Sequence, residues 1–323
     1  MDNTYKTNKY RQPMFEIVGM TSTELTFAVA FAYIESGHTE TFCWVLDKLK
    51  QLFVKKDLVP QVILTNRDLG LMKAIGTVFP RSINLLCRFH INKNVGAKQK
   101  HYVASDMQKK IDELWTDVVW ASDEVEYVQR LNQLEQTCVD CNEFIDYVKD
   151  IWLTPHRQRF VRVWINRVLH LGNTATNRLK QMLGNSINGM VKCREAMNDN
   201  LKLQLSKIRA SFQKSFDEVE HAHVSPFYNN LRGSVSRDAL RCIAEELKRV
   251  DYVGTNKEIC RCTLRTTYRL PCACELIGYR IDGIPIPIDA MHVHWRKLSM
   301  EVKLDEDVDD GSEVCCWKKD IKK

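Results

Sequence analysis

The chain has 323 residues, of which 44% are hydrophobic and 27% are charged. This size and apolar content suffice for one large or two ordinary folded domains and exclude a protein that is disordered throughout. The formal net charge of +6 at pH 7 allows a polyanionic partner but does not require one. No apolar run is long enough for a membrane span, and the first residues lack the apolar core of a signal peptide. We therefore expect a soluble, intracellular protein without a membrane partner.

The N-terminal third of the chain alternates predicted strands and helices. Residues 14–20 are apolar and β-prone, and residues 25–34 alternate with a period of two, which predicts a β-hairpin. Two antiparallel strands followed by alternating strands and helices indicate an α/β layer. The further elements that we expect are a helix over 39–53, a strand over 62–65, a helix over 68–78, a strand over 83–87 and a helix that begins near Phe89.

Polar residues follow the predicted strand 62–65 at once. In an open α/β sheet the carboxyl ends of the strands form a crevice, so Asn66 and Asp68 lie where a ligand or metal would bind. A two-metal phosphoryl-transfer site needs several carboxylate oxygens, and Asn66 offers only a neutral carbonyl. A working two-metal site is therefore disfavoured. For Asp68 we favour the role of an acid at a helix start, where it interacts with the helix dipole.

From residue 105 to 221 the spacing of apolar residues is helical almost throughout. Ser105 to Gln108 has the pattern of a capping box, and Ser122-Asp123-Glu124 predicts the start of a second helix. Pro155 is expected between two further helices. Residues 187–221 predict a long helix that breaks or bends near Asn198-Asp199-Asn200, and Ser236 is expected to cap another helix that ends before Asp251.

Arginines and aromatic residues alternate in the segment that follows Pro155. This pattern fits a basic face that contacts phosphates, and it equally fits the solvated side of an amphipathic helix, which is the commoner case. The residues concerned are Arg157, Arg159, Arg162 and Arg167, with Phe160 and Trp164 among them.

The chain has 12 cysteines. In the absence of a secretory signal they favour reduced thiols and metal ligands over a disulfide framework. Four of them form two close pairs after Gly254, where the sequence becomes rich in turn residues and short β-prone pieces, as in a small metal-stapled module. Arg261, Arg265 and Arg269 would favour the thiolate form. The four residues Cys260, Cys262, Cys272 and Cys274 predict a tetrahedral zinc site, which would be structural because four protein ligands leave no open position.

Two other cysteine patterns are weaker. Cys138 and Cys141 have the spacing of a metal-binding pair, but no second pair lies near them in sequence, so we interpret them as reduced thiols at a helix boundary. Cys87 and His90 lie at a strand-to-helix junction near the predicted crevice. A lone thiol and imidazole are more often structural than ligating, and their role stays open.

Several segments occur in an order that is typical of one protein family. They are Asp2-Asn3-Thr4-Tyr5-Lys6-Thr7-Asn8, Thr65-Asn66-Arg67-Asp68-Leu69, Phe79-Pro80, Cys87-Arg88-Phe89-His90-Ile91-Asn92-Lys93-Asn94 and the cysteine module. In these segments the chain resembles the Mutator-like element (MULE) transposases of plants, whose relatives include the domesticated far-red-impaired-response regulators. The resemblance covers nearly the whole chain. It implies a ribonuclease-H-like core interrupted by a helical insertion, a DDE triad that cuts and joins DNA with two divalent metal ions, a SWIM-type zinc finger and a nuclear location.

The family's acids can be followed along this chain. The first acid matches Asp2, whereas the second falls on Asn66. The third is a Glu that follows an Asn-Arg-Val, but here Asn177-Arg178 runs directly into Leu179, so the piece that holds the Glu is deleted. The family's first strand lies upstream of the first acid, and we therefore expect that strand and any N-terminal DNA-binding domain to be absent. In the zinc module, Cys274 stands where SWIM fingers commonly have His, and sulfur can serve there equally well.

The predicted fold class is α/β, with a truncated ribonuclease-H-like core, a large all-helical insertion and a small C-terminal zinc module. The expected regions are 1–97 for the core without its first strand, 98–250 for the helical insertion and continuation of the core, 251–298 for the SWIM-type finger and 299–323 for a disordered charged tail.

The predicted function is that of a transposase-derived protein whose catalytic positions Asp2, Asn66 and Asp68 are defective. It would retain structural zinc and bind DNA or protein partners, with no small-molecule substrate, and would need Mg²⁺ only if the catalytic site worked. One alternative is an active divalent-metal-dependent DDE transposase in which Asp68 replaces the missing acid. The other is a nuclear regulator of transcription that resembles the far-red-impaired-response proteins.

Overall fold

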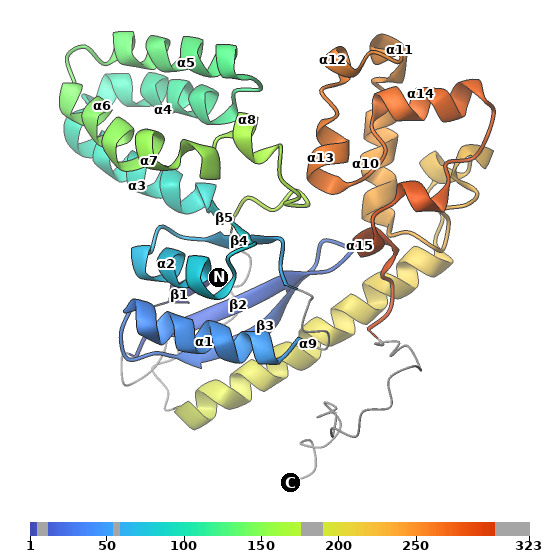
Figure 1. Ribbon diagram of the computed structural model, residues 1–323, viewed down its shortest axis with the longest axis horizontal. Coiled ribbons are helices and arrows are strands. Elements are labelled where there is room, and N and C mark those ends of the chain that lie inside the picture. Colours follow the sequence, from blue (N-terminus) through green and yellow to red (C-terminus); the bar gives the residue numbers. More distant parts are fainter. Residues whose placement is uncertain (5–11, 54–58, 176–189, 301–323) are drawn as a thin grey trace.

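The computed structural model describes residues 1–4, 12–53, 59–175 and 190–300. A small β-layer with two flanking helices occupies the centre, a group of helices lies above it, and the C-terminal helices form a separate group at its side (Figure 1). The chain is therefore a mixed α/β protein in which helices predominate, as the sequence predicted in outline. The predicted tail, residues 299–323, lies outside the described residues from Glu301 onward.

The strands form two small sheets. In the first, β1 (Asp2–Thr4), β2 (Met14–Met20) and β3 (Thr26–Tyr33) pair antiparallel in that order, so the predicted hairpin is confirmed. In the second, β4 (Val62–Thr65) and β5 (Ile83–Leu86) run parallel. The amino group of Met1 donates a hydrogen bond of 2.7 Å to the carbonyl of Leu64, which places β1 beside β4.

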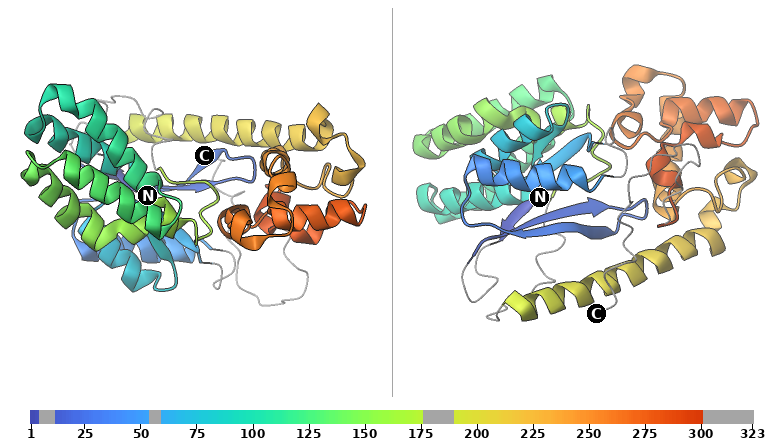
Figure 2. Two further views of the ribbon diagram at one scale, coloured as in Figure 1. Left: turned by 90° about the horizontal axis from the view of Figure 1, so that it is seen from above. Right: turned by 60° about the horizontal axis from the view of Figure 1, so that its bottom comes forward.

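Helices cover both faces of the antiparallel sheet. On one side, α1 (Thr39–Gln51) and α2 (Leu69–Val78) bury their apolar faces against β2 and β4, and the rings of Phe15 and Phe42 meet edge-on at 5.3 Å. On the other side, the long helix α9 (Met190–Asp217) runs under β3 (Figure 2). The amide of Gln204 in α9 accepts a hydrogen bond of 3.1 Å from the backbone of Ala28, and Ile208 and Phe212 pack beside Phe27.

The predicted helical block forms its own hydrophobic core around Trp115, Phe144 and Phe160, which are all buried. A one-turn π-helix over 149–153 and a 3₁₀ turn over 157–159 join its last helices. Its α-helices are α3 (Arg88–Tyr102), α4 (Ser105–Trp120), α5 (Glu124–Thr137), α6 (Asn142–Val148), α7 (Thr154–His156) and α8 (Arg162–Ile165).

The helices that follow α9 share a second core, in which Trp295 and Leu276 are fully buried. Ser236 caps the first of them by accepting a hydrogen bond of 3.3 Å from Ala239, as the sequence predicted. The members are α10 (Arg237–Leu247), α11 (Val250–Val253), α12 (Lys257–Cys260), α13 (Thr263–Tyr268), α14 (Ala273–Ile281) and α15 (Val293–Arg296). Within the described ranges, no helix combines the length and apolar character that crossing a membrane requires.

Several local predictions were wrong. The expected capping box at Ser105 does not form: Ala104 is the N-cap of α4, and the Gln108 amide instead donates to the carbonyl of Val103 at 3.0 Å. Helix α9 passes through residues 198–200 without a break, since packing against β3 outweighs the low helix propensity of Asn. Pro155 does not separate two helices, since it lies in the first turn of α7, directly after the π-helical turn 149–153.

The cysteine module also differs from expectation, because residues 254–300 contain helices and turns and no strand. The β-prone pieces there are short, and left-handed residues interrupt them. Arg261, Cys262 and Arg269 all have φ near +50°, which no strand tolerates. Apolar side chains of short helices, such as Leu276 on α14, are instead buried in the core with Trp295.

Candidate functional site

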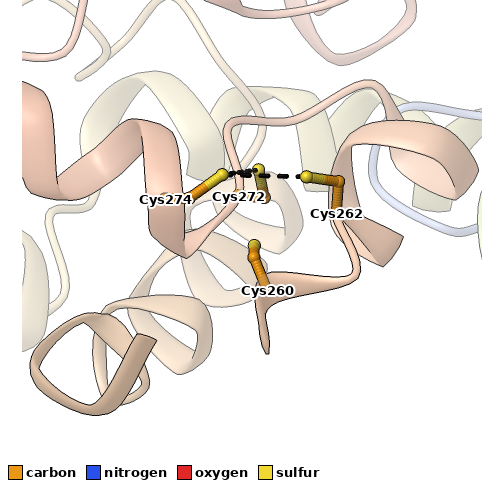
Figure 3. Close-up of side chains that lie close together, drawn as sticks. All are labelled: Cys260, Cys262, Cys272 and Cys274. Atoms are coloured by element: carbon orange, nitrogen blue, oxygen red, sulfur yellow. Dashed lines mark hydrogen bonds between the residues drawn. The ribbon is translucent and has the colours of Figure 1, made fainter. Parts of the chain in front are cut away.

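The four predicted cysteine ligands converge on one point (Figure 3). Their sulfur atoms all lie within 4.8 Å of one another. The Sγ atom of Cys274 is 3.7 Å from that of Cys262 and 3.5 Å from that of Cys272. Sulfurs bound to one tetrahedral zinc at 2.3 Å would be about 3.8 Å apart, which is close to the two distances from Cys274.

The first cysteine pair depends on an unusual turn. Asn256 caps the short helix α12 by accepting hydrogen bonds from the backbone of Glu258 and Ile259. After Cys260 the chain turns through two left-handed residues, Arg261 and Cys262, with φ of 56° and 45°. Such φ values are costly for residues with a Cβ, and they persist only where the surroundings fix them. The turn directs both thiols to the same side, although a single residue separates them.

The second pair begins a helix. Cys272 is the N-cap of α14, and the Glu275 carboxylate accepts a 2.9 Å hydrogen bond from the Cys272 N–H. Arg265 holds that carboxylate in an ion pair of 2.8 Å. The N–H groups of a helix N-terminus favour negative charge, so this position suits thiolate ligands. Glu275 and Arg265 do not belong to the quartet, but their hydrogen bonds fix the position of Cys272, as is typical of the residues around a metal site.

Without a cation the four thiols do not all ionise readily. Burial raises the pKa of Cys272 and raises that of Cys274 to about 12. Burial also acts to raise the pKa of Cys260, but hydrogen bonds from the backbone of Cys274 and Cys262 bring it below its ordinary value. A bound dication would supply the missing positive charge and deprotonate the remaining ligands. The quartet could therefore hold a metal ion such as zinc.

The strand edge predicted as a catalytic crevice has a different character. Asn66 and Arg67 follow β4, and Cys87 and Arg88 follow β5. Because Thr65 pairs with Leu86, the two arginines lie at equivalent positions beyond the strand ends. The Oδ1 atom of Asn66 is buried and accepts no hydrogen bond from the described residues. Guanidinium groups and an amide thus stand where a two-metal site needs carboxylates.

Asp68 has the structural role that the sequence favoured. Its Oδ1 atom accepts a hydrogen bond of 3.0 Å from the N–H of Leu71, so it is the N-cap of α2. The start of this helix is tightly packed, since a Cβ added to Gly70 would lie 2.6 Å from the carbonyl oxygen of Gly37. The carboxylate is therefore engaged at the helix start.

For some of the other candidate residues the structure describes only the backbone or nothing at all. The backbone of Asp2 forms β1, but its side chain lies outside the described part, and so does the segment around Asn177 and Leu179. Cys87 is buried, and His90 is half-buried on α3. Cys138 is fully buried at the end of α5, as expected for a structural thiol. Where the structure is described, the cysteine quartet is the one cluster of three or more potential ligand side chains close enough to share an ion.

The sequence interpretation missed the arginines of the strand edge. Arg67 donates from Nε to Nε2 of His156 at 3.3 Å and lies over the ring of Trp152. Arg159 donates to Oδ1 of Asn84 at 3.1 Å, which ties the helical block to β5. A signal was present, because Arg67 stands two residues and Arg88 one residue after a predicted strand.

The N-terminal strands and helices that carry this edge can be compared with known families. Residues 1–94 match the model of the MULE transposase domain. The matched MULE region comprises β1 to β5 with α1, α2 and the first half of α3, and it therefore includes Asn66, Asp68 and Cys87. The resemblance stated from the sequence is confirmed for this part of the chain.

Two curated proteins are similar to the chain beyond the MULE region. The PKS-NRPS hybrid synthetase cheA of Chaetomium globosum is 23% identical over an alignment of 347 positions, which covers 94% of this chain and 7% of that protein. Protein FAR-RED IMPAIRED RESPONSE 1 of Arabidopsis thaliana is 22% identical over 183 residues, which is 55% of this chain and 21% of that protein. The chain thus spans a small part of the length of each.

Proposed function

We propose that this chain is a transposase-derived protein of the Mutator-like class whose catalytic site is defective and whose cysteine module binds structural zinc. The MULE match of residues 1–94 supports the origin. The core would be ribonuclease-H-like. The strand order β3-β2-β1, with β1 beside the parallel pair β4-β5, supports this assignment. The proposed regions are those expected above, 1–97, 98–250, 251–298 and 299–323. The hydrophobic clusters around Phe42, Trp115 and Trp295 support three packed parts, and the Trp295 cluster also takes in residues 228–250.

The loss of catalysis is supported by the charges at the strand edge. Two dications held close together need several negative oxygens, and each missing carboxylate removes one unit of negative charge. The family's second acid falls on Asn66, and the nearby cations Arg67 and Arg88 would repel the metals further. This combination of a neutral amide and two guanidinium groups is the observation that carries the proposal.

Purified protein with a DNA substrate and added Mg²⁺ or Mn²⁺ tests the loss of catalysis. We expect no nicking or strand transfer above the level of the Asp2→Ala variant. Divalent-metal-dependent cleavage that Asp2→Ala abolishes would overturn the proposal. The same assay tests the alternative of an active enzyme that uses Asp68, since activity would then be sensitive to Asp68→Asn as well. The capping bond from Asp68 to Leu71 counts against this alternative.

The zinc assignment rests on the sulfur spacing of the quartet. A closed four-thiolate site would stabilise the module and leave no coordination position for water, so the metal would have no hydrolytic role. We propose that this module is a SWIM-type finger with Cys274 in place of His. Elemental analysis of the purified protein should find one zinc per chain, and a chain without bound zinc would contradict the assignment.

A second candidate function is regulation of transcription in the nucleus through DNA or protein partners, without chemistry. The similarity to FAR-RED IMPAIRED RESPONSE 1 favours it. Its test is the cellular location of the protein together with DNA affinity measured at several salt concentrations. Contacts with phosphates predict an affinity that falls steeply as salt rises. A cytoplasmic protein without DNA affinity would exclude this candidate.

A further inference from the structure

Arg88 is an unusual residue because its charged side chain is almost wholly buried. It is 6% exposed, and its guanidinium group lies over the ring of Trp120 at 4.4 Å. Nε donates to the carbonyl of Phe160 at 2.7 Å, which fixes the orientation of the group. Nη2 is also buried, and it meets no acceptor among the described residues.

A second guanidinium group faces the same indole. Arg162, at the start of α8, lies 5.9 Å from the Trp120 ring centre. Burial, and then the nearby charge of Arg162, lower the pKa of Arg88 to about 10. The two guanidinium groups are therefore close enough to affect each other. Neither arginine forms an ion pair with a carboxylate in the described part of the chain. Two cations held beside one aromatic ring without a counter-charge repel each other, and an anion between them would relieve that repulsion.

His170 is a second unpartnered polar group, and burial, followed by the charge of Arg88, lowers its pKa to about 4. It is 8% exposed, and neither ring nitrogen has a hydrogen-bond partner in the described part of the chain. The neighbouring segment is tied to Arg88, whose N–H donates to the carbonyl of Thr174 at 3.0 Å. The His170 ring lines the cavity beside β2 and β4, which Arg88, Arg162 and Trp120 do not line, so His170 is not part of the arginine–indole group.

The ring of Trp120 remains accessible from outside. Its side chain is 49% exposed although the two arginines lie against it. An exposed indole beside one buried and one half-buried guanidinium group can hold a phosphate and leave the indole accessible to a base. Arginine is also the side chain best suited to phosphate, because its planar donors match two oxygens at once.

We infer that Arg88, Arg162 and Trp120 form a phosphate-binding site that works without a divalent metal. The ligand class is a phosphate group, either free or carried by a single-stranded nucleic acid whose base would stack on Trp120. The site lies between α4, α8 and the end of β5, apart from the cysteine quartet. It goes beyond the proposed function, because neither zinc binding nor the loss of catalysis requires it.

Calorimetric titration of the zinc-loaded full chain tests the site, with no Mg²⁺ added. The probes are inorganic phosphate, a 5′-phosphorylated single-stranded oligonucleotide and the same oligonucleotide without its 5′-phosphate, all at constant ionic strength. Arg162→Gln removes one cation from a half-buried side chain and should weaken binding of the phosphate probe about tenfold, the effect of losing one charge-assisted hydrogen bond. Arg88→Lys keeps the charge but removes the planar guanidinium group, whose donors have a fixed direction, and it should weaken binding by a similar factor.

Arg157→Gln is the matched control. Arg157 lies over Trp164 at 5.5 Å, in the same segment and the same type of contact, but away from Trp120. We expect this variant to bind phosphate as the unaltered chain does. The melting temperature of each variant shows whether it is folded. If Arg88→Lys does not fold, Arg162→Gln alone decides.

The outcomes separate the two sources of phosphate. Binding of inorganic phosphate that Arg162→Gln weakens supports a site for the free ion. Binding of the oligonucleotide alone, weakened by Arg162→Gln and by loss of the 5′-phosphate, supports a nucleic-acid ligand. Absence of binding by every probe overturns the inference. Equal weakening by Arg162→Gln and Arg157→Gln also overturns it, because general electrostatic attraction then accounts for the affinity. None of these results depends on whether the strand edge cleaves DNA.

Discussion

Arg261 of the cysteine turn and Asp123, the N-cap of α5, form an ion pair of 3.1 Å that joins the C-terminal module to the helical block. Both side chains are about half exposed. The Asp123 carboxylate also accepts a hydrogen bond of 2.8 Å from the N–H of Glu126, and this bond, ahead of the charge of Arg261, lowers the pKa of Asp123. The pair therefore combines a helix cap with a contact between two parts of the chain.

The first prediction concerns this contact. Arg261→Ala should change the free energy of unfolding by less than about 1 kcal/mol, because exposed ion pairs contribute little. Asp123→Ala should cost about 1 kcal/mol or more, since it also removes the cap of α5. Chemical denaturation of both variants measures the difference. Equal effects would show that the cap contributes nothing beyond the ion pair.

The second prediction concerns the metal. Chelation of zinc should unfold the region 251–298 and leave the core around Trp115 intact, since the two parts have separate hydrophobic clusters. Hydrogen exchange should show loss of amide protection in α11 to α15, which lie in this region, and unchanged protection in α4 and α5. Cys274→Ser should reproduce this effect, whereas Cys43→Ser, on the distant helix α1, should not. Uniform loss of protection after chelation would contradict the prediction.

The third prediction compares two glycines of α2. Gly70→Ala would place a Cβ 2.6 Å from the carbonyl oxygen of Gly37, so the backbone must shift, and we expect destabilisation of about 1–3 kcal/mol. A Cβ on Gly76 would meet nothing within 4 Å. Gly76→Ala should stabilise the protein by about 0.5–1 kcal/mol, because alanine loses less entropy in a helix. Thermal unfolding of the two variants provides the measurement, and shifts of the same sign would refute the packing of α2 described here.

The fourth prediction concerns acid sensitivity. Hydrogen bonds from Arg241 and then Arg237 lower the pKa of Glu220 to about 2 from an ordinary value near 4.5. A carboxylate with a depressed pKa stabilises the folded state above its unfolded pKa, and that contribution is lost as the pH falls from about 4.5 to about 2. Glu220→Gln should therefore reduce stability at pH 7 and flatten its decline in acid. Urea denaturation across this range measures both effects. Glu245→Gln, which removes a carboxylate from an exposed pair with Lys248, is the control and should leave the slope unchanged.

The elements of the N-terminal third could be predicted closely because local pattern and tertiary environment agree there. The run from Val62 to Thr65 is apolar and β-prone, it is followed by the capping residue Asp68, and the structure has a strand and a capped helix at these positions. The cysteine quartet was also predictable, because the two pairs are close in sequence and a shared metal explains both.

Other features depend on contacts that a linear pattern does not contain. Helix α9 continues through Asn198 to Asn200 because it packs under β3, a contact between distant segments. The secondary structure of the cysteine module was mispredicted because β-prone residues there lie on short helices separated by left-handed turns at Arg261, Cys262 and Arg269. The pairing of Arg88 and Arg162 across Trp120 arises from three separate elements and has no sequence signature of its own.

The 28 residues of α9 form one unbroken helix about 42 Å long. Its middle lies under β3, and the chain returns to it after the cysteine module, where Leu298 packs against Ile208 and Phe212. The carbonyl of Lys297 accepts a hydrogen bond from Ser22 in the turn of the first hairpin. The segment that follows the cysteine module is thus held between α9 and the tip of the first hairpin, so the module is anchored to the N-terminal sheet at its C-terminal end.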